Sequence, residues 1–344
     1  MTRNYQDLKQ VLGRGRFFDA QPVYYALVIG GTLAALACSL WIFTWARGPI
    51  AILLDTAFFS FVSVQLGFLM HDAGHHAIFR RSWKNELAGM MFGDLLNGLP
   101  FGWWAPHHGR HHAHPNHDEL DPDLPTLRIA LALSEEEARQ ARGWKRLVVK
   151  HQVIAFPFLF PGQTLALKFF GVRHLVTHVS PRSLLELALV IVHHVAYFGF
   201  FVHYLGVWPG LGVAALHHII VGTHLSTVLG TNHIGRPFAP RESEDPFLDQ
   251  VEPSRNIRTH PLFECFWGSL NHQIEHHLFP SMSRNQIRRA LPIVRQFCRE
   301  RGVNYEEVSV VECYRQILKD LGEISAAARG SRTPTSAPSN APSA

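Results

Sequence analysis

The sequence is poor in charge and in cysteine. Charged residues make up 17% of the 344 residues, compared with roughly 25% in soluble domains. The mean hydropathy is nevertheless only +0.02, because apolar segments alternate with polar, basic ones. The four cysteines form no Cys-x-x-Cys pair, and Cys38 lies inside an apolar run. The sequence therefore indicates neither a disulfide framework nor a cysteine-held cluster, and it favours a reducing, cytoplasm-facing location.

Several catalytic signatures are absent as well. The sequence has no Glu-x-x-His pair of the carboxylate-bridged di-iron bundles, no His-Glu-x-x-His of zinc proteases, no Ser-His-Asp arrangement and no glycine-rich phosphate loop. The formal charge of +5 and the pI of about 9.2 do not indicate nucleic acid, because the basic residues flank apolar segments and no nucleic-acid motif occurs. Anionic headgroups or an acidic protein partner suit these basic residues better.

Four apolar segments have the length of a membrane-spanning helix, about 20 residues. They cover residues 22–45, 50–70, 183–205 and 207–230, and short turns join them in two pairs. A buried hairpin of a soluble protein is the alternative for the first pair, but its length and the further spans downstream weigh against it. We therefore predict an all-α integral membrane protein with four transmembrane helices in two hairpins.

The remaining segments differ from these spans in composition. Residues 1–21 are polar and of mixed charge, and the long run after them predicts a retained anchor instead of a cleaved signal peptide. The apolar stretch 153–170 is broken by prolines and a glycine, which favours a helix lying in the membrane interface. The tail 326–344 is rich in Ser, Pro and Ala, and we expect it to be disordered. The membrane domain is thus predicted over 22–325.

The distribution of basic residues predicts the orientation. The two short turns contain only Arg47, whereas the opposite regions contain many basic residues, among them Arg3, Lys9, Arg14, Arg16, Arg80, Arg81 and Lys84. Positive residues remain on the cytoplasmic side of a membrane protein. We therefore expect a protein of the cell (inner or cytoplasmic) membrane with both termini in the cytoplasm.

Histidine is the outlier of the composition, with 23 residues. Eight of them stand in three tight clusters and one isolated position: His71 and His75; His108, His111 and His112; His276 and His277 after Gln273; and His233. Spacings of three and four residues place side chains on one face of a helix, and imidazole suits iron, copper and zinc. Two spans separate the second cluster from the third, so all clusters lie on one side of the membrane. We expect a dinuclear site for oxygen chemistry on a lipid.

Acidic neighbours would orient the imidazoles and offset the charge of the metal. Asp72 and Glu275 are positioned for this, as are Asp118 and Asp121, although each can also be a solvated loop charge. Other histidines lie within the predicted spans: His193, His194, His203, His217, His218 and His224. Hydrogen bonding across helices is the favoured role for them, with a functional role as the alternative.

With these motifs the chain resembles the membrane fatty acid desaturases. The pattern His-x-x-x-His, His-x-x-His-His and Gln-x-x-His-His is the signature of that family, and Asn271-His-Gln-Ile-Glu-His-His-Leu-Phe-Pro280 is similar to its front-end and acyl-CoA branch. Gln273, where many relatives have histidine, is typical of front-end members. The resemblance covers roughly residues 20–320.

The resemblance implies a fold and a ligand set. Four membrane helices would lie under a cytoplasmic helical cap that holds two irons, with no catalytic residues beyond the metal ligands. The implied ligands are His71, His75, His108, His111, His112, His233, His276 and His277. Gln273 would be a ninth contributor, direct or through water, and Asn232 would hold a water.

The resemblance also implies the activity, an O2-dependent insertion of a cis double bond into the acyl chain of an acyl-CoA or acyl-lipid. The His-Pro-Gly-Gly haem motif of fused cytochrome b5 domains does not occur, so a separate ferredoxin or cytochrome b5-like donor with its reductase is expected. A lipid or alkane hydroxylase or a carotenoid oxygenase using the same metals is the alternative, and a non-catalytic metal transporter is a remote one. Arg80, Arg81, Lys84 or Arg284 would be able to contact a CoA phosphate, although a solvated role is favoured for each.

Overall fold

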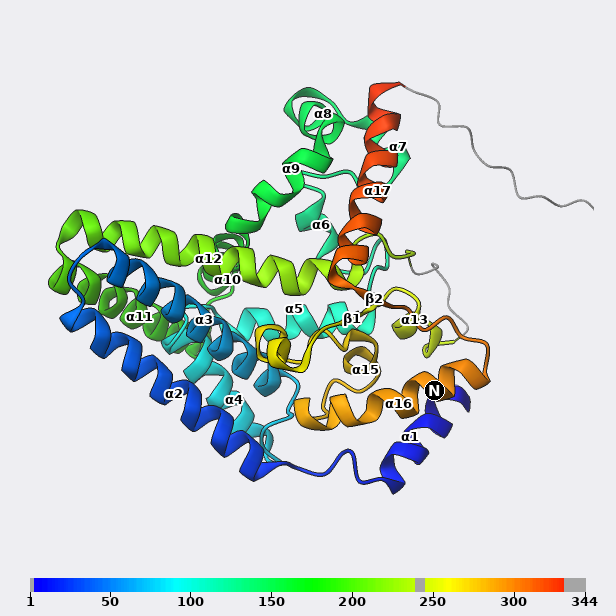
Figure 1. Cartoon of the computed structure of the whole chain (residues 1–344), viewed down its shortest axis with the longest axis horizontal. Coiled ribbons are helices and arrows are strands. Elements are labelled where there is room, and N and C mark those ends of the chain that lie inside the picture. Colours follow the sequence, from blue (N-terminus) through cyan, green and yellow to red (C-terminus); the bar gives the residue numbers. More distant parts are fainter. Residues whose placement is uncertain (1–2, 239–244, 331–344) are drawn as a thin grey trace, which may run out of the picture.

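The computed structural model describes residues 3–238 and 245–330, and it is built almost entirely of helices (Figure 1). Four long helices lie together on one side of the molecule: α2 (Pro22–Trp45), α3 (Pro49–Gly74), α11 (Pro181–Leu205) and α12 (Val207–His233). They occupy the four predicted ranges, with ends that differ by at most four residues. The structure therefore confirms that the four predicted apolar segments are helices joined in two pairs.

Local sequence explains where these helices begin. Pro22, Pro49 and Pro181 each occupy a first helical position, where a missing N–H costs nothing and φ is already helical. Gly48 and Gly206 form the tight turns of the two hairpins with φ of 87° and 85°, a region that glycine enters without strain. The hairpins pack on each other through α3 and α12.

A fifth segment is also long and apolar enough to cross a membrane, by length and composition, among the described residues. It consists of α9 (Gln152–Leu159), the 3-10 turn η2 (Phe160–Gly162) and α10 (Gln163–Thr177). The turn η2 rests on α12 at Gly222, where an added Cβ would lie 2.4 Å from the Pro161 carbonyl oxygen. The segment predicted to lie in the interface is thus a broken helix packed on the bundle, and the number of spans stays a prediction.

Most of the shorter elements gather beyond one end of the four long helices, whereas residues 82–95 pack alongside these helices (Figure 1). Between the hairpins come α4 (Ser82–Met90), the π-helix η1 (Met91–Leu95), α5 (Phe101–Ala113), α6 (Leu124–Leu127), α7 (Glu135–Gln140) and α8 (Gly143–Lys150). After the second hairpin come α13 (Leu248–Val251), η3 (Pro261–Phe263), α14 (Glu264–Trp267), α15 (Gln273–Leu278), α16 (Arg284–Glu300) and α17 (Val310–Arg329). The N-terminal α1 (Arg3–Arg14) packs on α16.

Two short strands link two segments of the C-terminal part of the chain. Strand β1 (Asn256–Arg258) pairs in parallel with β2 (Glu307–Ser309), with Ile257 opposite Val308. Buried side chains of α1, α15 and α16 form one core cluster, and those of α3, α12 and α17 contribute to another. Helix α17 continues to Arg329, beyond the predicted start of the tail at Ala326, and 331–344 lie outside the described residues.

Candidate metal centre

The predicted ligands come from the ends of four helices. His71 lies in the last turn of α3 and His75 caps it, while His233 is the last residue of α12. Helix α5 carries His108, His111 and His112, and the six-residue α15 carries Gln273, His276 and His277. Because a helix end can aim a side chain beyond the helix, these four ends direct their imidazoles to one region.

The eight histidines form two adjacent groups. One contains His71, His75, His108, His112 and His276, and the other contains His111, His233 and His277. Within each group, one nitrogen per residue lies within 4.8 Å of the others. The rings of His112 and His277 stack with centroids 4.2 Å apart and so connect the two groups. All eight predicted residues therefore meet in a single place, in an arrangement suited to two metal ions.

Unpartnered nitrogens show that the histidines fit a metal. The Nε2 atoms of His71, His75, His276 and His277 and the Nδ1 atom of His112 are buried without a hydrogen-bond partner among the described residues. A buried polar atom without a partner costs free energy, and so many in one place are rare in native proteins. Metal coordination would satisfy the four Nε2 atoms, and neutral imidazole is a common ligand of zinc, copper and iron.

The opposite ring nitrogens are held by acceptors. His111 Nδ1 lies 3.0 Å from Asp121 Oδ2, His233 Nδ1 lies 3.0 Å from the Pro253 carbonyl oxygen, and His277 Nδ1 lies 3.2 Å from Gln250 Oε1. A carbonyl oxygen only accepts, so His233 carries its proton on Nδ1 and keeps a lone pair on Nε2, which the Gln273 amide nitrogen approaches at 3.0 Å. This is how metal-binding histidines are oriented in proteins.

Burial keeps most of these rings neutral. It is the main cause that holds the pKa of His75, His108, His112, His276 and His277 well below the ordinary value, and neighbouring imidazoles lower these pKa values further. His111 differs, because burial would lower its pKa but the hydrogen bond to Asp121 and the charge of Asp123 raise it above the ordinary value. The set is thus mostly in the protonation state that binds metal.

Asp72 lies where the sequence suggested. Its Oδ1 is 3.7 Å from His71 Nδ1, and its Oδ2 accepts a 2.5 Å hydrogen bond from Arg284 Nε. Arg284 is itself buried, with 7% of its side chain exposed. Both interpretations of Arg284, the favoured solvated role and the alternative contact with a CoA phosphate, are therefore wrong, because its guanidinium is buried and paired with Asp72.

Glu275, Asn232 and Gln273 form further hydrogen bonds. Glu275 is fully buried and accepts from Tyr305 Oη at 2.7 Å and from Asn256 Nδ2 at 2.8 Å, so it fixes α15 without touching a described imidazole. Asn232 Nδ2 donates to Gln273 Oε1 at 2.9 Å, and Gln273 Nε2 lies 3.0 Å from His233 Nε2. Gln273 thus lies at the edge of the three-histidine group, and the buried Asn232 Oδ1 has no partner among the described residues.

Some residues near the site were not anticipated. Asp123 accepts from His107 Nε2 at 2.8 Å and lies 3.5 Å from His111 Nδ1, so it acts beside Asp121, which the sequence did suggest. Gln250, whose Oε1 lies 3.2 Å from His277 Nδ1, belongs to none of the sequence motifs. The carboxylate of Asp118 binds Arg128 instead of an imidazole. A signal for Asp123 existed in its spacing two residues after Asp121, whereas nothing in the sequence indicated Gln250.

The histidines inside the long helices are hydrogen-bonded to their surroundings. Nδ1 of His193, His194 and His218 lies 3.0, 2.8 and 2.9 Å from the carbonyl oxygens of Leu95, Val190 and Ala214. His217 Nδ1 lies 3.2 Å from Ser60 Oγ, and His224 Nε2 lies 2.7 Å from the Phe266 carbonyl oxygen. His193, His217 and His224 thus bond to other elements, in agreement with the favoured interpretation of hydrogen bonding across helices. His194 and His218 instead bond to the carbonyl oxygen four residues earlier in their own helix.

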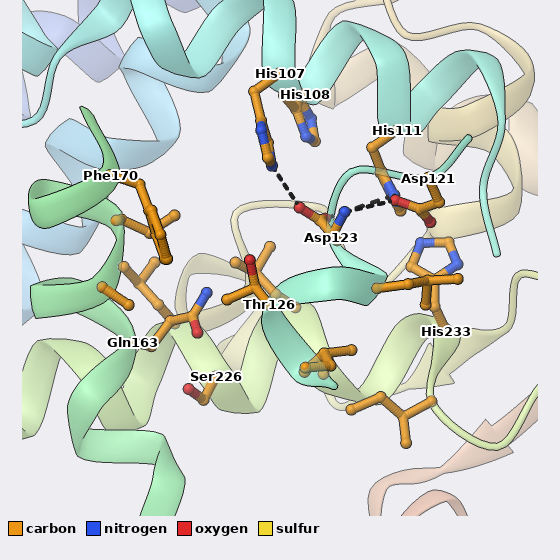
Figure 2. Close-up of a pocket in the computed structure, with 18 of the residues that line it drawn as sticks. His107, His108, His111, Asp121, Asp123, Thr126, Gln163, Phe170, Ser226 and His233 are labelled. Carbon is orange, nitrogen blue, oxygen red and sulfur yellow. Dashed lines mark hydrogen bonds and ion pairs between the residues drawn. The ribbon is translucent and has the colours of Figure 1, made fainter. Parts of the chain in front are cut away.

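A cavity of about 1050 Å³ reaches the histidines (Figure 2). His108, His111 and His233 line it, together with apolar side chains such as those of Phe156 and Phe160. Figure 2 shows His107, Asp123 and His111 along one side of the cavity and Phe170 and Gln163 across from them. A long apolar chain that occupies this cavity can therefore reach the candidate metal centre.

Comparison with known proteins gives a consistent result. A family model described as fatty acid desaturase matches residues 43–309, which is more than half of the chain. The chain is 29% identical to an acyl-lipid (9-3)-desaturase of Physcomitrium patens, over 98% of this chain and 65% of that protein. It is 27% identical to fatty acid desaturase 3 of Bos taurus and of Homo sapiens, over 93% of this chain and 72% of each relative. The chain thus spans about two thirds of the length of these relatives.

Proposed function

Because this chain belongs to the fatty acid desaturase family, we propose that it uses O2 to introduce a cis double bond into a fatty acyl chain. Two hydrogens leave neighbouring methylenes, and with O2, two electrons and two protons they yield the alkene and two waters. The observation that carries the proposal is the set of buried, unpartnered histidine nitrogens beside an apolar cavity. This combination brings a metal site and a hydrocarbon together.

The proposed metals are two irons, one in each histidine group. His71, His75, His108, His112 and His276 would hold the first, and His111, His233 and His277, with Gln273 at their edge, the second. Iron bound there would supply the oxidising power that removal of hydrogen from an unactivated methylene requires. Asp121, Gln250 and the Pro253 carbonyl would keep the second group oriented through their hydrogen bonds to its rings.

The cavity would position the acyl chain and exclude water. Its apolar walls bind methylenes without specific contacts, so the position of the double bond depends on where the headgroup stops. Phe156 and Phe160 would surround the part of the chain beyond the metals, and Trp104, whose ring stacks on His108 at 4.5 Å, would cover it near them. A dry site also protects the reaction from side reactions with water.

The proposed setting is the cytoplasmic face of the cell membrane. The four long helices would span the bilayer as two hairpins, and the elements beyond their ends would form the cytoplasmic cap. A separate ferredoxin or cytochrome b5-like protein with its reductase would deliver the electrons. The relative from Physcomitrium patens is an acyl-lipid desaturase, which makes an acyl-lipid one candidate substrate, and acyl-CoA is the other.

The test is a fatty acid profile of a host that expresses the chain with a ferredoxin and its reductase. We expect a new double bond by mass spectrometry, which His276→Ala abolishes. His114→Ala is the matched control, because His114 is exposed at the end of α5 and belongs to neither histidine group. A new hydroxyl in place of the double bond would support the hydroxylase instead, and an unchanged profile with both electron carriers present would reject the proposal.

A further inference from the structure

Helices α8 and α9 carry apolar side chains that project away from the rest of the described chain. Trp144 and Leu147 of α8 and Ile154 and Phe158 of α9 are 63, 65, 67 and 77% exposed. One exposed apolar side chain is ordinary, but a contiguous set indicates an interaction surface. The four are spaced by three, seven and four residues, which is the spacing of one helix face, and only His151 separates the two helices. We call these four side chains the outer stripe.

The outer stripe continues along α10, in the segment that is long and apolar enough to cross a membrane. Leu165 and Phe169 of α10 are exposed as well. On the opposite face of the same segment, Phe156, Phe160 and other side chains line the cavity. The segment therefore has an inner face toward the cavity and an outer face toward its surroundings. Because a membrane-length apolar helix presents such an outer face to lipid, the continuity indicates lipid over the outer stripe too.

Helix α8 has the pattern of a helix that lies at a membrane surface. At about 100° per residue, Trp144 and Leu147 share one face, and Lys145 and Lys150 lie on either side of that face. Val149 points elsewhere, into a buried cluster with residues of α17. Lysines beside an apolar face can rest their stems on it and extend their charged ends to headgroups. The cations of α8 are thus placed where phosphates of a lipid surface would be.

These cations have no carboxylate partner among the described residues. Lys145 and Lys150 form no ion pair there, and neither does Arg142, the N-cap residue of α8. The exposed carboxylates of α7 and α17, which pack on α8, bind within their own helices: Glu135 and Glu136 to Arg139, and Glu323 to Lys319. The charge of Arg142, Lys145 and Lys150 is therefore available to an anion outside the protein.

An apolar face bordered by free cations fits the boundary between acyl chains and anionic headgroups. We propose, on the basis of the proposed function and its membrane setting, that α8 lies in the headgroup layer of the cytoplasmic leaflet and binds anionic phospholipids through Arg142, Lys145 and Lys150. An acidic protein would satisfy these cations, but a face that continues the outer side of a membrane-length helix is covered by lipid. In Figure 1, α8 and α9 lie on the side of α12 that faces away from α2, next to α17.

Lipid bound at α8 would also act on the rest of the structure. Arg329 Nη1 donates to the Lys150 carbonyl oxygen at 2.7 Å, and Ser325 Oγ donates to the Val149 carbonyl oxygen at 3.0 Å. The end of α17 is thus tied to α8, while α9 continues from α8 into the wall of the cavity. Anionic lipid at α8 therefore holds both α17 and the outer wall of the cavity at a fixed depth relative to the bilayer.

The experiment uses the fluorescence of Trp144 in lipid nanodiscs that contain the full chain. Lipids with bromine on their acyl chains quench tryptophan that they touch, and the signal of Trp144 is the difference between the chain and its Trp144→Phe variant. A minor fraction of brominated lipid, either phosphatidylglycerol or phosphatidylcholine, competes with unbrominated phosphatidylcholine. We expect both to quench Trp144, and phosphatidylglycerol to do so with a relative affinity about fivefold higher or more.

A triple substitution tests the cations. Arg142→Gln, Lys145→Gln and Lys150→Gln together should bring the relative affinity close to that of phosphatidylcholine and leave the quenching by phosphatidylcholine itself in place. High salt should weaken the preference of the unmodified chain in the same way. The matched control replaces three exposed cations of other elements: Lys9→Gln, Arg258→Gln and Arg299→Gln. It should leave the preference unchanged, and melting temperatures show that the variants are folded.

Three results would overturn the proposal. The first is equal quenching by the two brominated lipids, or a preference that survives the triple substitution. The second is a Trp144 that aqueous iodide quenches and brominated lipid does not, which would place α8 in water. The third is a Trp144 that neither quenches, which would mean that protein covers it. Because no turnover is measured, a lipid preference in a chain that forms no double bond would reject only the proposed function.

Discussion

The buried ion pair between Arg284 and Asp72 allows a demanding test of how the site is held. Arg284 is the first residue of α16, which follows the histidines of α15 along the chain, and Asp72 adjoins His71 at the end of α3. Their 2.5 Å contact therefore ties two histidine clusters together, and the rings of His71 and His276 lie 4.7 Å apart beside it. We expect Arg284→Met to disturb the five-histidine group specifically.

The magnitude follows from burial. Both side chains are only 7% exposed, and removal of one partner of a buried pair leaves an uncompensated charge that costs about 3–5 kcal/mol. Replacement of both partners by neutral groups is often close to neutral, so adding Asp72→Asn to Arg284→Met should restore most of the lost stability. Loss of a group that orients a ligand typically lowers metal affinity about 10–100-fold, and we expect this loss at the five-histidine group.

The assay combines thermal unfolding in detergent with the iron content per chain by elemental mass spectrometry. Arg288→Met is the matched control on the same helix, because Arg288 is 53% exposed and its ion pair with Glu264 lies at the surface. Surface pairs contribute about 0–1 kcal/mol. The reasoning fails if Arg284→Met retains full iron and stability, or if the double substitution is as unstable as Arg284→Met alone.

Three further outcomes are expected. Asp121→Asn should lower iron affinity at the three-histidine group about 10–100-fold, measured by iron titration, and unchanged occupancy would contradict a role for the carboxylate in holding His111. Gly222→Ala should destabilise the protein by about 1–3 kcal/mol in a melting assay, because its Cβ would lie 2.4 Å from the Pro161 carbonyl oxygen, whereas Gly212→Ala has no neighbour within 4 Å and should be tolerated. Chelation should lower the melting temperature, because a metal at 100 times its Kd contributes about 2.7 kcal/mol; equal melting curves with and without metal would contradict this.

The sequence predicted those features that local pattern determines. Apolar length placed the four long helices, because a membrane-length helix needs an unbroken apolar run. Histidine spacing predicted that the members of each cluster share a helix face, because residues three and four apart lie on one face, whereas the inclusion of the isolated His233 followed from the family resemblance. His193 was correctly expected to bond across helices, since an imidazole within an apolar helix needs a partner, whereas His218 bonds to Ala214 of its own helix.

Features that depend on long-range contacts were not predicted. Gln250 reaches His277 from the short helix α13 and stands in no recognisable motif. Asp123 contacts His107, and its spacing from Asp121 was the only signal in the sequence. Arg284 looks in the sequence like one more basic residue of an arginine-rich helix, yet its partner Asp72 is 212 residues away. Such pairings are decided by tertiary packing, which a single sequence read by local pattern does not contain.

The ion pair across 212 residues also bears on how the protein matures. The first two histidine clusters leave the ribosome with the first hairpin, but neither histidine group is complete until α15 and Arg284 have been made. At about 5–20 residues per second, this delay is roughly 10–40 seconds. The N-terminal helix α1 also gains its contact with α15 only after Leu278 has been made, because Tyr5 Oη donates to the Leu278 carbonyl oxygen at 2.9 Å. Metal loading is therefore a late event in biosynthesis, because chains that stall before α15 lack His276 and His277, which complete the two histidine groups.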